Sequence, residues 1–310
     1  MKHPATTPTL NSSNFNEARY GYETVGDHQI FFREAGDPEN PAIVLLHGFP
    51  TSSHMYRNII RMLSNNYYLI APDYPGFGES DCPSRESFSY TFDNIAEIVN
   101  QFLEQRGINQ FSLFIQDYGA PIGFRIATEH PEKVKAIITQ NGNAYEEGIN
   151  RETWEPIIQY WDRRKPELEE AIKTNIFSLE GIKWQYTHGT RNPDGIAPEN
   201  WNVDFMKMSR PGQHEIQLDL FFDYQNNLKL YPVWQQYLRE HQPPVLVVWG
   251  EHDAFFPAPG AEGYRRDLKN VDYHILNTGH FALEEEGPFI AEKIRAFLAQ
   301  IPAYSKPYKG

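Results

Sequence analysis

The sequence predicts an α/β fold, in which helices cover both faces of a mostly parallel, doubly wound β-sheet and a helical segment is inserted late in the chain. Short apolar runs of strand character alternate with amphipathic helices up to about residue 139, and again from residue 244. Between these parts lie helix-like segments, many aromatic residues and no clear strand. The predicted parts are a flexible polar leader (1–19), a core (20–142 and 243–302) and a helical lid (143–242).

The predicted elements follow in strict alternation. The strands are expected at 28–35, 42–46, 67–71, 111–116, 134–139, 244–249 and 271–276. The helices of the core are expected at 55–63, 91–106, 123–130, 258–268 and near 288–299. Residues 42–46 are continuously apolar, as in a strand covered on both faces. The segment 91–106 places its apolar residues on one helical face and stops at Gly107.

Composition narrows the class of protein. The net charge of −13 and the pI near 5.3 argue against a nucleic-acid or anionic-membrane surface. No apolar run approaches the roughly 18 residues of a membrane span. Cys82 is the only cysteine, so no intramolecular disulfide can form. These features favour a soluble protein of a reducing compartment, and we predict a cytoplasmic location.

One stretch, residues 111–123, has the form of a sharp turn from a strand into a helix. It begins as an apolar run, reaches one acidic residue, Asp117, and continues through small residues. A nucleophile elbow has this form, and its usual pattern is Gly-x-Ser-x-Gly. Here Ile115 stands in place of the first glycine, Asp117 replaces the serine and Gly119 is retained. The sequence therefore places a carboxylate where such an elbow carries its nucleophile.

Two further candidates follow predicted strands. Asp253 and His280, like Asp117, come just after strands, and sites in open α/β sheets form at the carboxyl ends of strands. Asp253 ends a Glu-His-Asp run, but adjacent loop residues rarely converge on one ion. We therefore predict neither a metal nor an organic cofactor.

These motifs, with the His-Gly-Phe-Pro sequence at 47–50, resemble the α/β-hydrolase superfamily, and within it the branch of epoxide hydrolases and haloalkane dehalogenases. The resemblance covers the chain from about residue 20 to residue 300. The chain order of nucleophile, acid and histidine is also that of the superfamily. The resemblance implies that Asp117 is the nucleophile, that His280 is the base and that Asp253 orients it.

The resemblance further implies that the backbone N–H groups of Phe49 and Tyr118 form an oxyanion hole. A carboxylate suits reaction at a saturated carbon, because Asp117 is ionised at neutral pH and can attack an epoxide or an alkyl halide unaided. The product is an ester, which water can cleave, whereas a serine would form an ether. His280 would take the proton from that water.

Halide substrates require donors for the departing ion. In the dehalogenases these are a tryptophan after the nucleophile and either an asparagine in the oxyanion loop or a lid tryptophan. Tyr118 and Phe49 occupy the first two positions, although the segments 50–53 and 115–124 look more like dehalogenase sequences. The lid candidates for one donor are Trp154, Trp161, Trp184 and Trp201. Fluoroacetate dehalogenases, which this chain also resembles, use an arginine beside the nucleophile, where this chain has Tyr118.

Epoxide substrates require an acid for the departing alkoxide, commonly a pair of lid tyrosines. The segment 223–227 resembles the one that carries such a tyrosine, which makes Tyr224 the first candidate and Tyr160 the second. We therefore predict an epoxide hydrolase that acts on a small apolar organic substrate and water. The alternatives are a haloalkane or haloacid dehalogenase and a small-molecule binding protein on the same scaffold.

Overall fold

The structure, a computed structural model, describes residues 16–302 and contains one eight-stranded sheet. The strand order is β1-β2-β4-β3-β5-β6-β7-β8, with β1–β2 and β2–β4 antiparallel and every later pair parallel. The strands are β1 (Arg19–Val25), β2 (His28–Ala35), β3 (Ala42–Leu46), β4 (Tyr68–Pro72), β5 (Phe111–Gln116), β6 (Val134–Gln140), β7 (Val245–Gly250) and β8 (Val271–Leu276). The predicted α/β fold class is confirmed.

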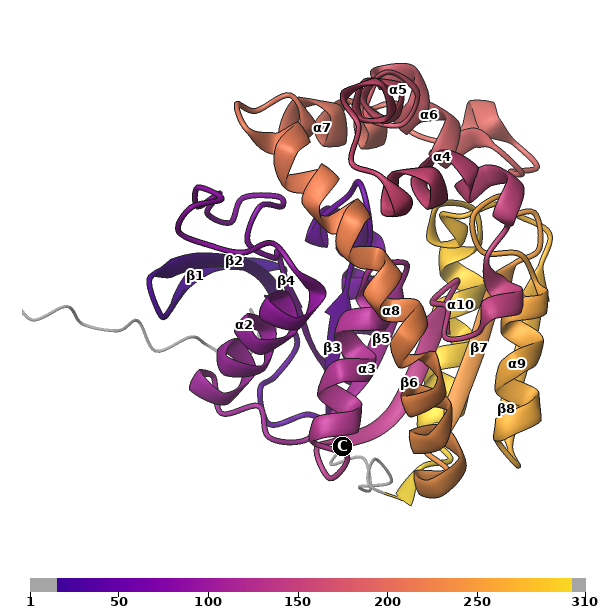
Figure 1. Cartoon of the computed structure of the whole chain (residues 1–310). Helices are drawn as coiled ribbons and strands as arrows, with labels where there is room; N and C mark the ends of the chain where they lie inside the picture. The colour runs from indigo at the N-terminus through magenta and orange to yellow at the C-terminus, as the bar shows by residue number, and fades with distance from the viewer. Residues whose placement is uncertain (1–15, 303–310) are drawn as a thin grey trace, which may run out of the picture.

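Helices cover both faces of the sheet (Figure 1). The core helices are α1 (Arg57–Leu63), α2 (Phe92–Gln105), α3 (Gly119–Glu129), α9 (Pro259–Asp267) and α10 (Ala282–Leu298), with the short η2 (Ser53–Tyr56) before α1. On one face α2 packs against α3, and on the other α1 packs against α10. Every residue of β3, β4, β5 and β7 is buried, as expected for central strands that helices cover on both sides.

Four helices of the predicted lid lie above the carboxyl ends of the parallel strands (Figure 1). They are α4 (Arg151–Asp162), α5 (Pro166–Asn175), α6 (Leu179–Thr187) and α7 (Glu199–Met208), with the short η3 (Glu146–Gly148) before α4 and η4 (Pro193–Gly195) between α6 and α7. The described residues between 143 and 242 form no strand.

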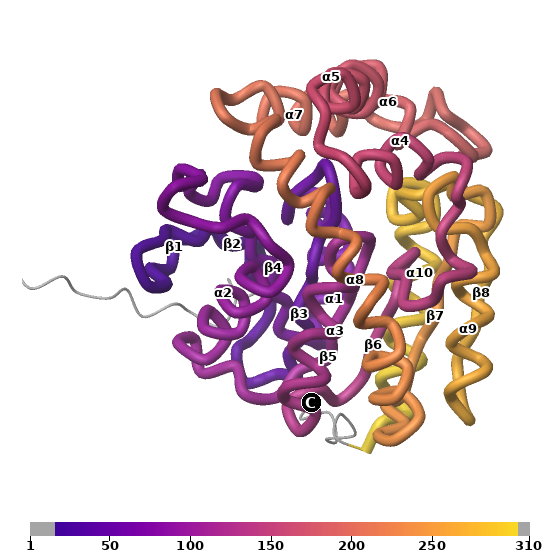
Figure 2. Tube along the Cα trace, viewed as in Figure 1, coloured from indigo at the N-terminus to yellow at the C-terminus, as the bar shows by residue number. Residues whose placement is uncertain are grey.

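The fifth helix of this segment, α8 (Gln213–His241), differs from the prediction. At 29 residues it is about 43 Å long, and it runs from the lid down the face of the sheet to the point where β7 begins (Figure 2). Its lower half packs on α3, where Trp234 stacks on Phe124 with ring centroids 5.4 Å apart. The segment 143–242 is therefore only partly a lid, because the second half of α8 covers the core.

Two boundaries also differ from the prediction. Residues 1–15 of the expected leader lie outside the described residues, and β1 begins at Arg19, within the expected leader. The β1 strand was missed because its side chains reverse the usual pattern. Tyr20 and Tyr22 are 61% and 58% exposed, whereas Gly21 faces inward against the ring of Phe32. Helix α10 begins before Pro288 rather than near it, so the proline lies inside the helix.

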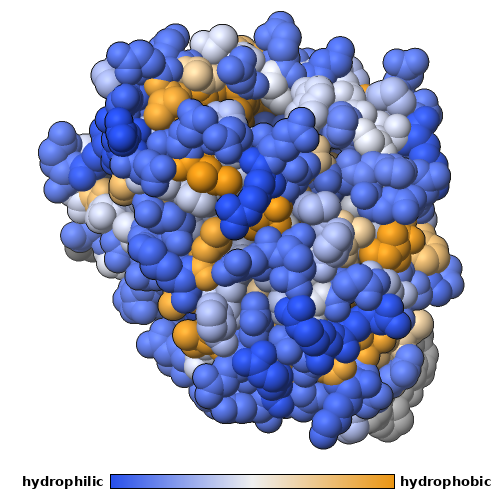
Figure 3. Space-filling view, turned by 45° about the vertical axis from the view of Figure 1, so that its right-hand side comes forward, coloured by the Kyte–Doolittle hydropathy of each residue, from blue (hydrophilic) through white to orange (hydrophobic). Residues whose placement is uncertain are grey.

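The molecular surface is mainly hydrophilic on the face shown in Figure 3, where small apolar patches are separated by polar side chains. Within residues 16–302, no helix is both long and apolar enough to cross a membrane.

Candidate active site

Asp117 occupies a tight turn between β5 and α3. Its backbone φ is 49°, in the left-handed region that residues other than glycine rarely adopt. The turn also brings two backbone segments close together, because a Cβ on Gly119 would lie 2.0 Å from the carbonyl oxygen of Leu46. The side chain of Asp117 is buried at the carboxyl end of β5. Such a strained, well-supported turn is typical of a functional site.

Both predicted oxyanion donors meet on one oxygen of this carboxyl group. The backbone N–H of Phe49 donates to Asp117 Oδ1 at 2.7 Å, and that of Tyr118 donates to the same atom at 2.6 Å. The loop can come this close only because residue 48 is glycine. A Cβ there would lie 2.4 Å from the Cβ of Asp117. Oδ1 is thus fixed by two amides, while Oδ2 accepts neither bond.

The side chain of His47 supports the loop that carries Gly48 and Phe49. Its ring stacks on Tyr74 at 3.9 Å between centroids, and its Nδ1 donates to the Gly48 carbonyl oxygen at 3.0 Å. Burial lowers the pKa of His47 to about 3, so the ring is neutral at ordinary pH. This arrangement fits a structural role for the side chain.

His280 lies between the two predicted catalytic aspartates. Its Nδ1 donates to Asp253 Oδ2 at 2.7 Å, and its Nε2 lies 3.9 Å from Asp117 Oδ2. Because a carboxylate can only accept, the bond to Asp253 fixes the proton on Nδ1 and leaves a lone pair on Nε2. The side-chain nitrogen of Gln116 lies 2.9 Å from His280 Nε2 and can donate to this lone pair. The structure therefore brings Asp117, His280 and Asp253 together in one site.

Two amide side chains that the sequence did not single out hold this arrangement in place. Asn141, just after β6, donates to Asp253 Oδ2 at 2.8 Å and exchanges hydrogen bonds with the backbone of Gly250. Gln140 donates to the carbonyl oxygen of His280 at 2.9 Å. Gln140 ends β6 and Asn141 follows it, which is a usable signal, but amides at strand ends commonly serve turns. Their role became visible only with the packing of β6 between β5 and β7.

The surroundings of Asp117 and His280 raise the pKa values of both side chains. Burial raises the pKa of Asp117 to about 6, although the charge of His280 and the two backbone amides oppose this rise. Burial by itself lowers the pKa of His280, but the Asp253 carboxylate and the charge of Asp117 outweigh it, and the net pKa lies above the ordinary value. The pKa values of the buried aspartate and histidine are thus both raised, and perturbed pKa values often mark functional sites.

Tyr224, the first candidate acid, faces the elbow from α8. Its ring lies 6.0 Å from that of Tyr118 and 4.6 Å from that of Trp154. Burial raises the pKa of its hydroxyl well above the ordinary value, and the charges of Tyr231 and Asp117 and a hydrogen bond to Tyr231 raise it further. The hydroxyl is therefore a buried group that stays protonated, is bonded to Tyr231 and lies within reach of the charge of Asp117.

Tyr160, the second candidate acid, is not brought to the site. Its hydroxyl donates to Glu169 Oε1 at 2.9 Å and accepts from Arg164 Nε at 2.8 Å. This hydroxyl is engaged within the lid by Glu169 of α5 and by Arg164, which lies between α4 and α5, so the structure lends no support to the predicted acid role of Tyr160. The helical pattern of the sequence could not tell which face of α4 would turn towards Asp117.

The lid tryptophans make contacts of other kinds. The indole N–H groups of Trp154 and Trp161 donate to backbone carbonyl oxygens at 3.1 and 2.7 Å. Trp184 is 41% exposed, and the ring of Trp201 faces the ammonium group of Lys183 at 5.5 Å. Two of the four candidate halide donors are thus already bonded to the protein.

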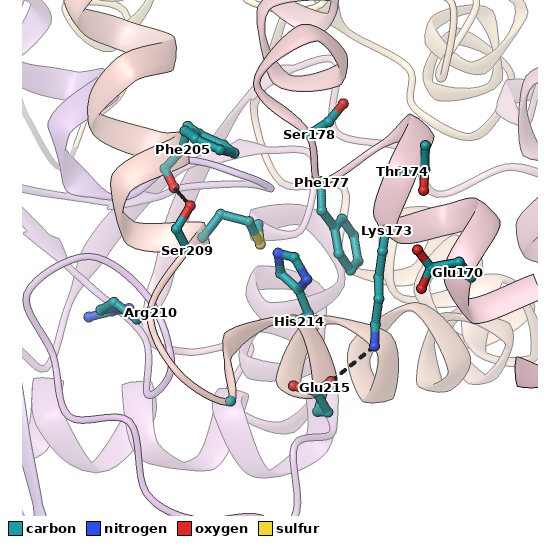
Figure 4. Close-up of a pocket in the computed structure, with 12 residues that line it drawn as sticks. Glu170, Lys173, Thr174, Phe177, Ser178, Phe205, Ser209, Arg210, His214 and Glu215 are labelled. Carbon is teal, nitrogen blue, oxygen red and sulfur yellow. Dashed lines mark hydrogen bonds and ion pairs between the residues drawn. The ribbon is translucent and has the colours of Figure 1, made fainter.

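A cavity of about 530 Å³ opens in the lid between α5, α7 and α8 (Figure 4). The rings of Phe177 and His214 adjoin each other inside it, with centroids 5.4 Å apart, and Lys173 pairs with Glu215 at 3.0 Å. The ring of Phe177 also lies 5.6 Å from that of Phe49 between centroids, so a residue that lines this cavity contacts the oxyanion loop. Nowhere in residues 16–302 do three or more His, Cys, Asp or Glu side chains form a group that could hold a metal ion.

Comparison with known proteins identifies the class. The chain belongs to the alpha/beta hydrolase fold family, whose sequence profile matches residues 41–287. It is 42% identical to an "uncharacterized hydrolase" of Saccharomyces cerevisiae, over 88% of this chain and 94% of the relative. It is 38% identical to a haloalkane dehalogenase of Mycolicibacterium paratuberculosis, over 86% of each chain. It is also 27% identical to epoxide hydrolase 3 of Xenopus tropicalis, over 91% of this chain and 78% of the relative. The predicted superfamily and branch are confirmed.

Proposed function

We propose that the protein is an epoxide hydrolase that works through a covalent ester on Asp117. The observation that carries the proposal is the buried Tyr224 hydroxyl near an aspartate whose Oδ1 is held by two backbone amides. This leaves Oδ2 as the attacking atom and provides an acid for the oxygen that leaves carbon.

In the first step, Asp117 Oδ2 attacks a ring carbon of the epoxide, and the carbon–oxygen bond of the ring breaks. Tyr224 gives up its hydrogen bond to Tyr231 and passes its proton to this oxygen, because the alkoxide is the stronger base even though the pKa of this tyrosine is raised. The amides of Phe49 and Tyr118 keep Oδ1 turned away from the attack.

In the second step, His280 Nε2 takes a proton from water, and the hydroxide adds to Cγ of the Asp117 ester. To do so the imidazole gives up its bond from Gln116, since a protonated Nε2 can no longer accept. The negative charge develops on Oδ1, where the two amides stabilise it, by about 3 kcal/mol for each donor. Collapse expels the alcohol oxygen, which takes the proton from His280. Asp117, left as an acid that holds the oxygen of the water, releases its proton to solvent, and the Tyr224 tyrosinate takes one up, so that one epoxide and one water give one diol.

Dehalogenation is the second candidate, favoured by the 38% identity to a dehalogenase over most of both chains. Two occupied indole N–H groups weigh against it, because a departing halide needs donors. A side-by-side assay of diol formation and halide release separates the two, with 1,2-epoxybutane, styrene oxide, 1-bromobutane and 1,2-dibromoethane as substrates. We expect diol; faster halide release would overturn the proposal, and binding without turnover would favour a binding protein.

The raised pKa of Asp117 predicts the acid limb of the pH profile. Only the carboxylate attacks, and burial keeps the proton on Asp117 up to about pH 6. We therefore expect kcat/KM for 1,2-epoxybutane to rise through an apparent pKa of about 6 and then to level off. Initial rates of diol formation between pH 4 and pH 9 test this. An acid limb near pH 4, the ordinary range of aspartate, would contradict it.

A further inference from the structure

Two buried polar side chains, one beside the proposed nucleophile and one on α8, have no hydrogen-bond partner among residues 16–302. Gln217, on α8, is fully buried, and neither atom of its amide has a partner. The hydroxyl of Tyr118 is buried and equally without a partner. Because buried polar groups are nearly always hydrogen-bonded, each calls for a partner other than the protein, either water or a bound ligand.

Both groups belong to the same region of the site. Gln217 precedes Phe221 by four residues and Tyr224 by seven, so the three side chains share one face of α8. The ring of Phe221 contacts Phe49 at 5.0 Å and Tyr118 at 6.3 Å between centroids. This face of α8 is thus turned to the elbow, and Gln217 lies one turn above the aromatic contact.

The same helix satisfies another buried amide. Gln213, one turn before Gln217, donates to the carbonyl oxygen of Gly76 at 2.6 Å. An amide at this depth can therefore be paired with the core when the chain provides an acceptor. Gln217 has no such acceptor among the described residues, and the next side chain on its face of α8 is the aromatic ring of Phe221.

We propose that Gln217 and Tyr118 bind a neutral, hydrogen-bonding substituent of the substrate. The inference rests on the proposed epoxide hydrolysis and replaces the apolar substrate expected from the sequence. The amide offers a donor and an acceptor, and the hydroxyl can act as either, which matches an alcohol or a primary amide. A carboxylate fits poorly, because Asp117 already places a negative charge beside Tyr118.

Isosteric substrate pairs test this subsite. Glycidol differs from 1,2-epoxybutane, and 5,6-epoxyhexan-1-ol from 1,2-epoxyheptane, only by a hydroxyl in place of a methyl group, at short and long reach. For at least one pair, we expect Gln217→Leu to lower kcat/KM of the alcohol about 10-fold or more and that of the hydrocarbon less than 3-fold, and Tyr118→Phe to lower the alcohol-to-hydrocarbon ratio of kcat/KM about 10-fold or more. The melting temperature of Gln217→Leu should be unchanged or higher, because leucine leaves no unpaired amide.

The control is Gln225→Leu, which removes a half-buried amide of α8 that donates to the Phe222 carbonyl oxygen. It should leave the ratio within each pair unchanged. The subsite is overturned if Gln217→Leu and Tyr118→Phe slow both members of both pairs equally, or slow neither. Diol formation by the wild type would still support the hydrolase in that case. Absence of diol from every epoxide, with no ester on Asp117, would remove the hydrolase and the subsite together.

Discussion

Replacing His280 with phenylalanine is expected to stop turnover after the first step and to leave the substrate bound to Asp117. Asp117 Oδ2 needs no base to attack, so the ester still forms, but Nε2 no longer activates water. We expect kcat to fall by about 10⁴-fold or more. Intact protein incubated with 1,2-epoxybutane should gain the mass of one substrate molecule, and peptide mapping should place the gain on Asp117.

The matched control is the double variant Asp117→Asn/His280→Phe, in which the attacking carboxylate is absent and no adduct should appear. An adduct that persists in this variant would mean that another side chain is alkylated. Consumption of epoxide by His280→Phe at the wild-type rate, with no gain of mass, would remove the covalent ester from the mechanism. In the structure His280 is held by Asp253 at 2.7 Å, so an Asp253 variant should weaken the same step.

Removing the Tyr224 hydroxyl is expected to separate epoxide opening from halide displacement. Tyr224→Phe should lower kcat/KM for epoxides by roughly 10²–10⁴-fold, the usual contribution of a general acid. Any halide displacement should change little, because a halide leaves without a proton. The measurement is diol formation and halide release by the same preparations, at several substrate concentrations.

Tyr160→Phe is the matched control, because this lid tyrosine is also buried but bonds to Glu169 and Arg164 instead of facing the elbow. It should retain wild-type activity on epoxides. If both variants are equally impaired, the lid acts through its packing and Tyr224 is not the acid. If Tyr224→Phe slows halide displacement as much as epoxide opening, its hydroxyl serves both leaving groups.

The fold could be predicted from the sequence because its core strands are short and apolar and alternate with amphipathic helices. The site residues could be proposed because Asp117, Asp253 and His280 each follow such a strand, and the carboxyl ends of parallel strands meet at one edge. The β1 strand could not be predicted, since Tyr20 and Tyr22 face solvent.

The lid was less predictable for a physical reason. Helical spacing shows that a segment is a helix, but the face that turns inward depends on partners far away in sequence. Tyr224 and Tyr160 have similar surroundings in the sequence, yet one faces Tyr118 and the other an ion pair. The roles of Gln116 and Asn141 depend in the same way on neighbours that only the folded sheet provides.

The long helix α8 has a consequence for how such a protein can change over evolution. Its upper half carries Phe221 and Tyr224, and its lower half is fixed to the elbow helix α3 by the Trp234–Phe124 stack and by a hydrogen bond from Arg125 to Asn227 at 2.8 Å. The separation of the proposed acid from the nucleophile is therefore set by the core together with α4, whose Trp154 packs on Tyr224. Helices α5 to α7 can diverge in sequence and length, and so admit substrates of new shapes, while the proposed reaction is kept.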